Sequence, residues 1–165
     1  MMTLDYRIRR DASGDDVAWA RIDGVSLGYW CFLGDIVLTT DDADLSMLWG
    51  WVPTLGFALQ MTHAAHRIQG GEPQTLEIPG SDQCLRFTPR GRRIEIVADY
   101  SEQPAFVSAR ELVEASDQML DRLRADVEGR HPGLLANRRY RDLVSRVAPS
   151  SRRSPTDYPG QSGGS

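Results

Sequence analysis

The chain has 165 residues and a mass of 18.4 kDa, which is the size of one domain. Its content of 41% hydrophobic, 8% aromatic and 25% charged residues excludes collagen-like, coiled-coil and wholly disordered proteins. All 19 basic residues are arginines, and against 23 acidic residues they leave a net charge of −4, so the overall charge gives no reason to expect nucleic acid or an anionic membrane as a partner.

Alternating apolar and polar residues predict strands in the first quarter of the chain. Residues 4–10 place Leu4, Tyr6 and Ile8 on one face, and residues 17–23 repeat this alternation. The two runs are expected to form a hairpin across the DASGDD turn. Residues 25–40 are apolar but interrupted by glycines, which predicts one or two further short strands with a turn at residues 34–35.

Residues 39–44, TTDDAD, are of the types that cap helices, and an apolar segment follows them and ends at Gly70 and Gly71. The pattern predicts a long helix after residue 44 with a break at Pro53, because proline lacks the backbone N–H. A calcium loop is the other interpretation of these aspartates. It fails because the EF-hand pattern requires a glycine at its sixth position and a glutamate at its twelfth.

The second half of the chain predicts more strands and then helices. Strands are expected at residues 74–78, 83–88 and 93–99. Ser108 and Glu111 have the spacing of a capping box and predict a helix to about Glu128, followed by a last helix over residues 134–147. The predicted fold class is α+β, a mainly antiparallel sheet of about five to six strands with two to three helices packed on one face. Residues 1–148 are expected to form a single globular domain and residues 149–165 a disordered tail.

The ends and the cysteines indicate a compartment. The first eleven residues are too charged for a signal peptide, and the apolar stretch at residues 47–61 is too short to cross a bilayer. Cys31 and Cys84 lie in apolar or strand-like stretches, where buried thiols are more common than disulfides. We therefore expect a cytoplasmic protein that does not contact membranes.

No motif predicts catalysis. GxSxG, GxGxxG and P-loop patterns are absent from the sequence. His63 and His66 are three residues apart on a predicted helix, but a zinc site needs three or four ligands. Two histidines near a helix C-terminus are also explained by the helix dipole. We expect no catalytic residue, no metal and no cofactor.

The tryptophans are the candidate ligand-binding residues. All four lie before residue 52, and they either pack in the core or line a pocket between the long helix and the sheet. If they line a pocket, the nearby histidines belong to it. The candidate set is Trp19, Trp30, Trp49, Trp51, His63 and His66.

The end of the chain is basic. Residues 129–153 contain seven arginines and one aspartate. Arg138, Arg139 and Arg141, with Tyr140 among them, are candidate partner-binding residues because guanidinium groups bind phosphate and carboxylate. The alternative is that this helix lies across the acidic body and neutralises it, which the negative net charge favours. Nucleic acid is accordingly an unlikely partner.

The arginine-only composition resembles that of proteins from high-GC actinobacteria. The segment ELVEASDQMLDRLRADVEGRHPGLLANRRYRDLV, with the strands before it, is similar to small actinobacterial α+β proteins, some of which are immunity proteins of toxin systems. The resemblance implies no functional residue.

Together, the acidic body, the size and the absence of catalytic motifs favour a non-enzymatic protein-binding module of the immunity or accessory type, which would bind a partner through an acidic sheet or loop surface. The alternative is a small-molecule-binding protein or small enzyme with a pocket between the long helix and the sheet. The sequence predicts no oligomeric state.

Overall fold

The computed structural model describes residues 1–10 and 18–146. This part of the chain contains two antiparallel sheets, of three and four strands, together with four α-helices and one 3-10 helix. The α+β class is confirmed, whereas the strands are divided between two sheets instead of forming one sheet of five to six strands. The predicted DASGDD turn and the predicted tail over 149–165 lie outside the described residues.

The three-stranded sheet has the order β1-β2-β3 and is formed by β1 (Thr3–Arg10), β2 (Leu33–Thr39) and β3 (Met47–Pro53). β1 pairs with β2, so the predicted hairpin with residues 17–23 is wrong. The helix α1 (Gly24–Tyr29) follows that segment instead, and the side chain of Asp23 accepts a hydrogen bond from the backbone N–H of Ser26 at 2.8 Å. This N-cap decides the local structure where the alternation of residues predicted a strand.

β3 occupies the first part of the predicted long helix, and the helix α2 (Thr54–Gln69) begins directly after Pro53. Residues 40–46 therefore connect two strands and do not cap a helix. In this connection the hydroxyl oxygen of Thr40 accepts hydrogen bonds from the N–H groups of Asp42 and Ala43. The predicted turn at residues 34–35 is also wrong, since both residues lie within β2.

The four-stranded sheet has the order β4-β5-β6-β7. Its strands are β4 (Gln74–Glu77), β5 (Cys84–Arg90), β6 (Arg93–Ala98) and β7 (Ala105–Ser108). The first three correspond to the three predicted strands. β7 was not predicted, and it completes the sheet by pairing with β6 from Arg93↔Ser108 to Ile96↔Ala105.

The helix α3 (Ala109–Arg130) begins at the predicted capping box, in which Ser108 and Glu111 bond reciprocally. The predicted last helix is divided into the 3-10 helix η1 (Pro132–Ala136) and α4 (Arg138–Ser145). Asn137 separates them. Its side-chain oxygen caps α4, while its amide group donates to the carbonyl oxygens of Trp19 and Ile22.

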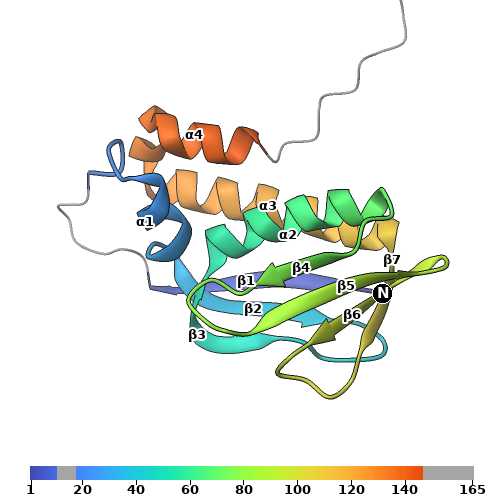
Figure 1. Ribbon diagram of the computed structural model, residues 1–165. Coiled ribbons are helices and arrows are strands. Elements are labelled where there is room, and N and C mark those ends of the chain that lie inside the picture. Colours follow the sequence, from blue (N-terminus) through green and yellow to red (C-terminus); the bar gives the residue numbers. More distant parts are fainter. Residues whose placement is uncertain (11–17, 147–165) are drawn as a thin grey trace, which may run out of the picture.

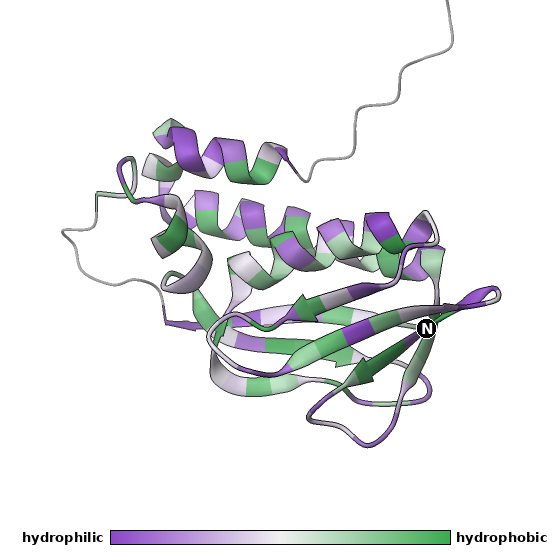
Figure 2. Ribbon diagram, in the orientation of Figure 1, coloured by the Kyte–Doolittle hydropathy of each residue, from purple (hydrophilic) through white to green (hydrophobic). Residues whose placement is uncertain are grey.

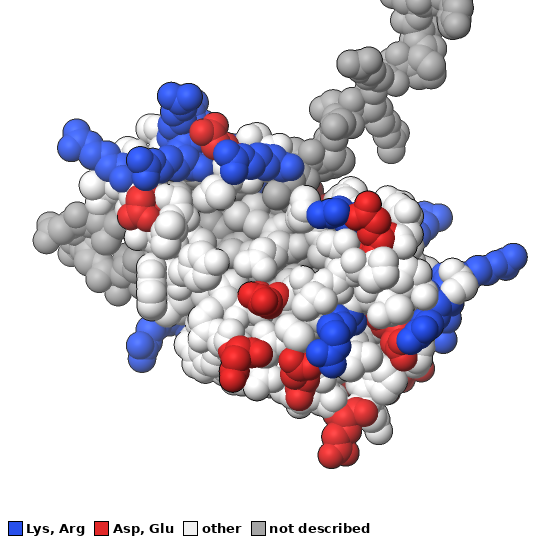
Figure 3. All heavy atoms as spheres, in the orientation of Figure 1, with Lys and Arg blue, Asp and Glu red and all other residues white. Residues whose placement is uncertain are grey.

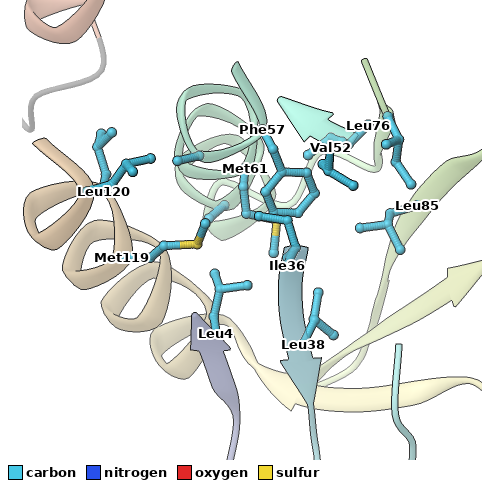
Figure 4. Close-up of a cluster of buried hydrophobic side chains, with 14 of the residues drawn as sticks. Leu4, Ile36, Leu38, Val52, Phe57, Met61, Leu76, Leu85, Met119 and Leu120 are labelled. Atoms are coloured by element: carbon cyan, nitrogen blue, oxygen red, sulfur yellow. The ribbon is translucent and has the colours of Figure 1, made fainter. Parts of the chain in front are cut away.

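α2 and α3 form a layer over the sheets, with α1 and α4 at one end of the molecule (Figure 1). α2 buries ten of its 16 residues, and it is correspondingly less hydrophilic than α4 in Figure 2. Side chains from β1, β2, α2 and α3 meet in the core, among them Leu4, Ile36, Phe57, Met61 and Met119 (Figure 4). The space between α2 and the sheets is therefore packed with buried side chains. Among the described helices, none combines the length and apolarity that crossing a bilayer requires.

Candidate functional site

The outer face of the three-stranded sheet carries two irregularities of strand pairing side by side. In β3, Met47 pairs with Ile36 and Val52 pairs with Gly34, so four residues of β3 lie opposite the single residue Asp35. In β1, the register shifts between Ile8 and Arg10. Bulges of this kind redirect side chains and are frequent next to binding sites.

Asp35 connects the two irregularities. Its side chain is only 4% exposed, and its Oδ1 accepts a hydrogen bond from the backbone N–H of Gly50 at 2.8 Å. Its Oδ2 accepts one from Nε of Arg9, also at 2.8 Å. Gly50 has a φ of +76°, a conformation that favours glycine and allows the β3 bulge to turn its N–H toward the carboxylate. A buried carboxylate needs such donors, and Asp35 thereby fixes both the bulge and Arg9.

A groove of about 640 Å³ lies over Asp35. It is open to solvent and is bounded by β1 on one side and the β3 bulge on the other. Its lining combines arginine, aromatic and aliphatic side chains, namely Arg7, Arg9, Arg10, Leu33, Asp35, Leu48, Trp49, Gly50 and Trp51.

Trp49 and Trp51 also line a second hollow of about 490 Å³, with residues 81–83 on its other side. The two indoles stack with their centroids 5.1 Å apart, and the ring of Tyr100 packs edge-on against Trp49 at 5.1 Å. The Tyr100 hydroxyl donates to the carbonyl oxygen of Leu45 at 2.8 Å. Burial and the nearby Asp44 carboxylate raise the pKa of Tyr100, so this hydroxyl keeps its proton and holds the aromatic group in place.

The groove is basic. It contains three arginines and one aspartate. Within residues 1–10 and 18–146, Arg7 and Arg10 have no ion-pair partner, and Arg9 pairs only with Asp35. The outer face of this sheet therefore differs from the acidic surface that the net charge of the chain led us to expect.

The structure separates the other predicted ligand-binding residues from the groove. Trp19 stacks on His131 with centroids 4.0 Å apart, next to Phe32. Trp30 directly follows α1 and is 69% exposed. The four tryptophans therefore do not line one cavity, and only Trp49 and Trp51 line the groove.

The two histidines of α2 have different surroundings. His63 is exposed, while Nε2 of His66 lies 2.9 Å from a carboxylate oxygen of Asp117 and links α2 to α3. In the described part of the chain, no group of three or more histidine, cysteine, aspartate or glutamate residues could hold a metal ion.

The candidate partner-binding residues of α4 have two different surroundings. Arg138, Arg139 and Arg141 are exposed and form a basic surface over α4 (Figure 3). The carboxylate nearest Arg138 is Asp142 of the same helix at 3.9 Å, and the other two arginines have no ion pair with any described residue. Tyr140 points inward, is 1% exposed and donates to Glu128 at 2.8 Å. Within the described residues, α4 does not neutralise the acidic body through ion pairs.

Cys31 and Cys84 are not joined by a disulfide, and only Cys31 is buried. The Cys84 thiol donates to Asp99 at 3.0 Å, and this hydrogen bond to a carboxylate raises the pKa of the thiol. A raised pKa keeps the thiol protonated, which opposes nucleophilic chemistry at Cys84.

Comparison of the chain with models of protein families, with curated proteins and with solved structures found no match. The groove itself therefore provides the basis for a function. Sequence reasoning identified Trp49 and Trp51 but not Arg7, Arg9, Asp35 or Leu48 as site residues. The three arginines of the predicted strand over residues 4–10 were the available indication, because all three line the groove.

Proposed function

We propose that this protein is a non-enzymatic protein-binding module whose groove on the three-stranded sheet holds or blocks a partner protein. One observation carries the proposal: large exposed apolar side chains lie beside arginines that form no ion pair with any described residue. Leu48 is 62% exposed and Trp51 42% exposed, and both line the same groove as Arg7 and Arg10. Tryptophan and arginine are enriched among the residues that contribute most to binding energy in protein interfaces.

The rigidity of the groove supports this proposal. Asp35 holds the β3 bulge and Arg9, while Tyr100 braces the tryptophan pair. Binding costs less conformational entropy when the contacting side chains are already ordered. The open shape of the groove also fits a segment of another protein better than an enclosed small ligand.

A small-molecule ligand remains the second candidate function. The hollow between the tryptophan pair and residues 81–83 has a volume of about 490 Å³, which lies within the range of small-molecule sites. A small molecule bound there would contact the two indoles and the polar groups of residues 81–83. Binding there would reduce the solvent exposure of Trp49 and Trp51 but not that of Leu48, which lines only the groove.

The composition of the groove favours protein over nucleic acid. A polyanion would use the three arginines but would leave Leu48 exposed, and the net charge of −4 opposes its approach. We place the module in the cytoplasm, in line with two cysteines that are not joined by a disulfide, and the resemblance to immunity proteins suggests an inhibitory or accessory role.

Site-specific photo-crosslinking in the native host tests this function. A benzophenone amino acid replaces Leu48 in one variant and Val25, which is 65% exposed on α1, in the other. We expect position 48 to crosslink one defined protein, and position 25 not to crosslink it. Adding Trp51→Ala to the position-48 variant should reduce the yield. Absence of a crosslinked protein, or the same product from both positions, would contradict the proposed function.

A further inference from the structure

We infer that the groove recognises an acidic–apolar segment of its partner, meaning a stretch of chain in which a glutamate or aspartate lies about three residues from a large apolar side chain. The carboxylate would bind the arginines of β1, and the apolar side chain would pack on Leu48 and Trp51. This inference rests on the proposed function and specifies the chemistry of the partner.

Arg9 is oriented for a carboxylate. Its Nε donates to the buried Asp35, and among the described residues it makes no other hydrogen bond. A guanidinium group has five N–H donors, so the terminal nitrogens of Arg9 can still donate to a second carboxylate in a planar, bidentate arrangement. The Arg9 side chain is 55% exposed, which leaves it accessible to a partner.

The charge of the groove requires an anionic partner. Arg7, Arg9 and Arg10 contribute three positive charges against the single negative charge of Asp35. Arg7 and Arg10 have no ion pair with any described residue. Bringing an apolar or cationic segment over these groups would cost desolvation without compensation, whereas carboxylates provide acceptors for all three arginines.

The opposite wall of the groove requires an apolar group. Leu48 and Trp51 come from the β3 bulge and expose 62% and 42% of their surface. β1 and β3 are separated by β2, and two strand spacings amount to about 10 Å. About three residues of extended chain span this distance, which sets the spacing between the carboxylate and the apolar side chain.

Peptide titration of the full-length protein, followed by tryptophan fluorescence, tests this inference. The probe is an acetylated and amidated ten-residue peptide in which two glutamates stand three positions before a phenylalanine. Its matched control has glutamine in place of both glutamates, and octathymidylate is the nucleic-acid probe. We expect saturable binding of the glutamate peptide, at least about tenfold tighter than that of the glutamine peptide, and weaker at about 150 mM than at about 20 mM salt.

Two charge-reversal variants locate the binding. Arg7→Glu combined with Arg10→Glu should abolish binding of the glutamate peptide, while Arg139→Glu combined with Arg141→Glu on α4 should leave it unchanged. Both pairs are exposed and without ion pairs to described residues, so thermal unfolding should show that both variants fold. Trp51→Ala should weaken both peptides, because both contain the phenylalanine.

Three results would overturn the inference: equal affinity for the glutamate and glutamine peptides, no saturable binding of either, or tighter and competing binding of octathymidylate. The crosslinking experiment separates this failure from failure of the proposed function. If position 48 crosslinks a protein through a segment without carboxylates, the module binds a protein but the acidic–apolar specificity is wrong.

Discussion

A single carboxylate determines the shape of the candidate groove. Asp35 is the only residue of β2 opposite the four-residue bulge of β3, and its two oxygens bond to different strands. Its ion pair with Arg9 is partly exposed on the arginine side, so screening limits the Coulomb contribution. The structural importance of Asp35 comes mainly from the buried acceptor that it supplies to the bulge.

Asp35→Ala should lower the free energy of unfolding by about 1–3 kcal/mol, because the N–H of Gly50 and the Nε of Arg9 lose their acceptor. Asp35→Asn should cost less, since the amide oxygen can still accept one of these hydrogen bonds. Urea unfolding of both variants and of Arg9→Gln measures the difference. Equal losses for the alanine and asparagine variants would show that the bulge does not depend on an acceptor at this position.

Tyrosine ionisation gives the protein a predictable alkaline limit. Burial and the Asp126 carboxylate raise the pKa of Tyr6 from an ordinary value near 10.0 to about 12. Burial also raises the pKa of Tyr140, which donates to Glu128. Between pH 10 and about pH 12, Tyr6 has lost its phenolic proton in the unfolded chain but keeps it in the folded chain. The folded state is therefore destabilised as the pH rises through this window, and fully stabilised below it.

The free energy of unfolding should accordingly fall between pH 10 and pH 12, and Tyr6→Phe should make this fall less steep. Urea unfolding at several alkaline pH values measures the slope for both proteins. The tyrosine residues that remain would still contribute to the slope of the variant. An unchanged slope would mean that Tyr6 titrates alike in the folded and unfolded states.

At the scale of elements, α1 and α2 pack unusually closely. A Cβ atom built on Gly56 of α2 would lie 2.1 Å from the carbonyl oxygen of Gly28 in α1. No real contact of this kind is so short, so a side chain there would have to push the two helices apart. The glycine in the first turn of α2 is thus explained by a close backbone approach.

Gly56→Ala should lower the free energy of unfolding by about 1–3 kcal/mol, because the helices must separate. Gly129→Ala is the matched control. Gly129 lies in α3 with no atom within 4 Å of its added Cβ, so the same substitution should be neutral or stabilise by up to about 1 kcal/mol through helix propensity. Thermal unfolding of the two variants tests the contrast, and a stable Gly56→Ala protein would show that α1 can shift at little cost.

The elements that the sequence predicts well are those determined by neighbouring residues. The capping box of Ser108 and Glu111 starts α3 where predicted, and β5 and β6 lie where neighbouring strands were predicted. The errors involve partners distant in sequence. β1 pairs with β2 across an intervening helix, and β3 is a strand because it pairs with β2, although the residues before it predicted a helix.

The same distinction explains the candidate site. Trp49 and Trp51 are recognisable by residue type, but the sequence predicts a turn at Asp35, where burial of its side chain is not expected. The groove forms where the bulged residues Arg9 of β1 and Gly50 of β3 both donate hydrogen bonds to Asp35. Register shifts of this kind depend on three strands at once, and no local pattern encodes them.

At the scale of the whole molecule, the arginines divide into those that connect elements and those that face solvent. Arg122 belongs to the first group, since its Nη2 donates to the carbonyl oxygen of Leu4 and links α3 to β1. Arg139 and Arg141 belong to the second group, on the basic surface of α4 (Figure 3). The negative net charge of the chain coexists with two exposed basic surfaces, the groove and α4.

Arg139→Gln combined with Arg141→Gln should change the free energy of unfolding by less than about 0.5 kcal/mol, because neither arginine pairs with a described residue. Arg122→Gln, the control, should cost about 1 kcal/mol through the lost hydrogen bond to β1. Urea unfolding at low and high salt measures both. If α4 stabilised the protein by neutralising its acidic body, the double variant would be clearly destabilised at low salt and would recover at high salt, where charge repulsion is screened. A double variant with the same stability at both salt concentrations would instead leave the α4 arginines free to contact a partner.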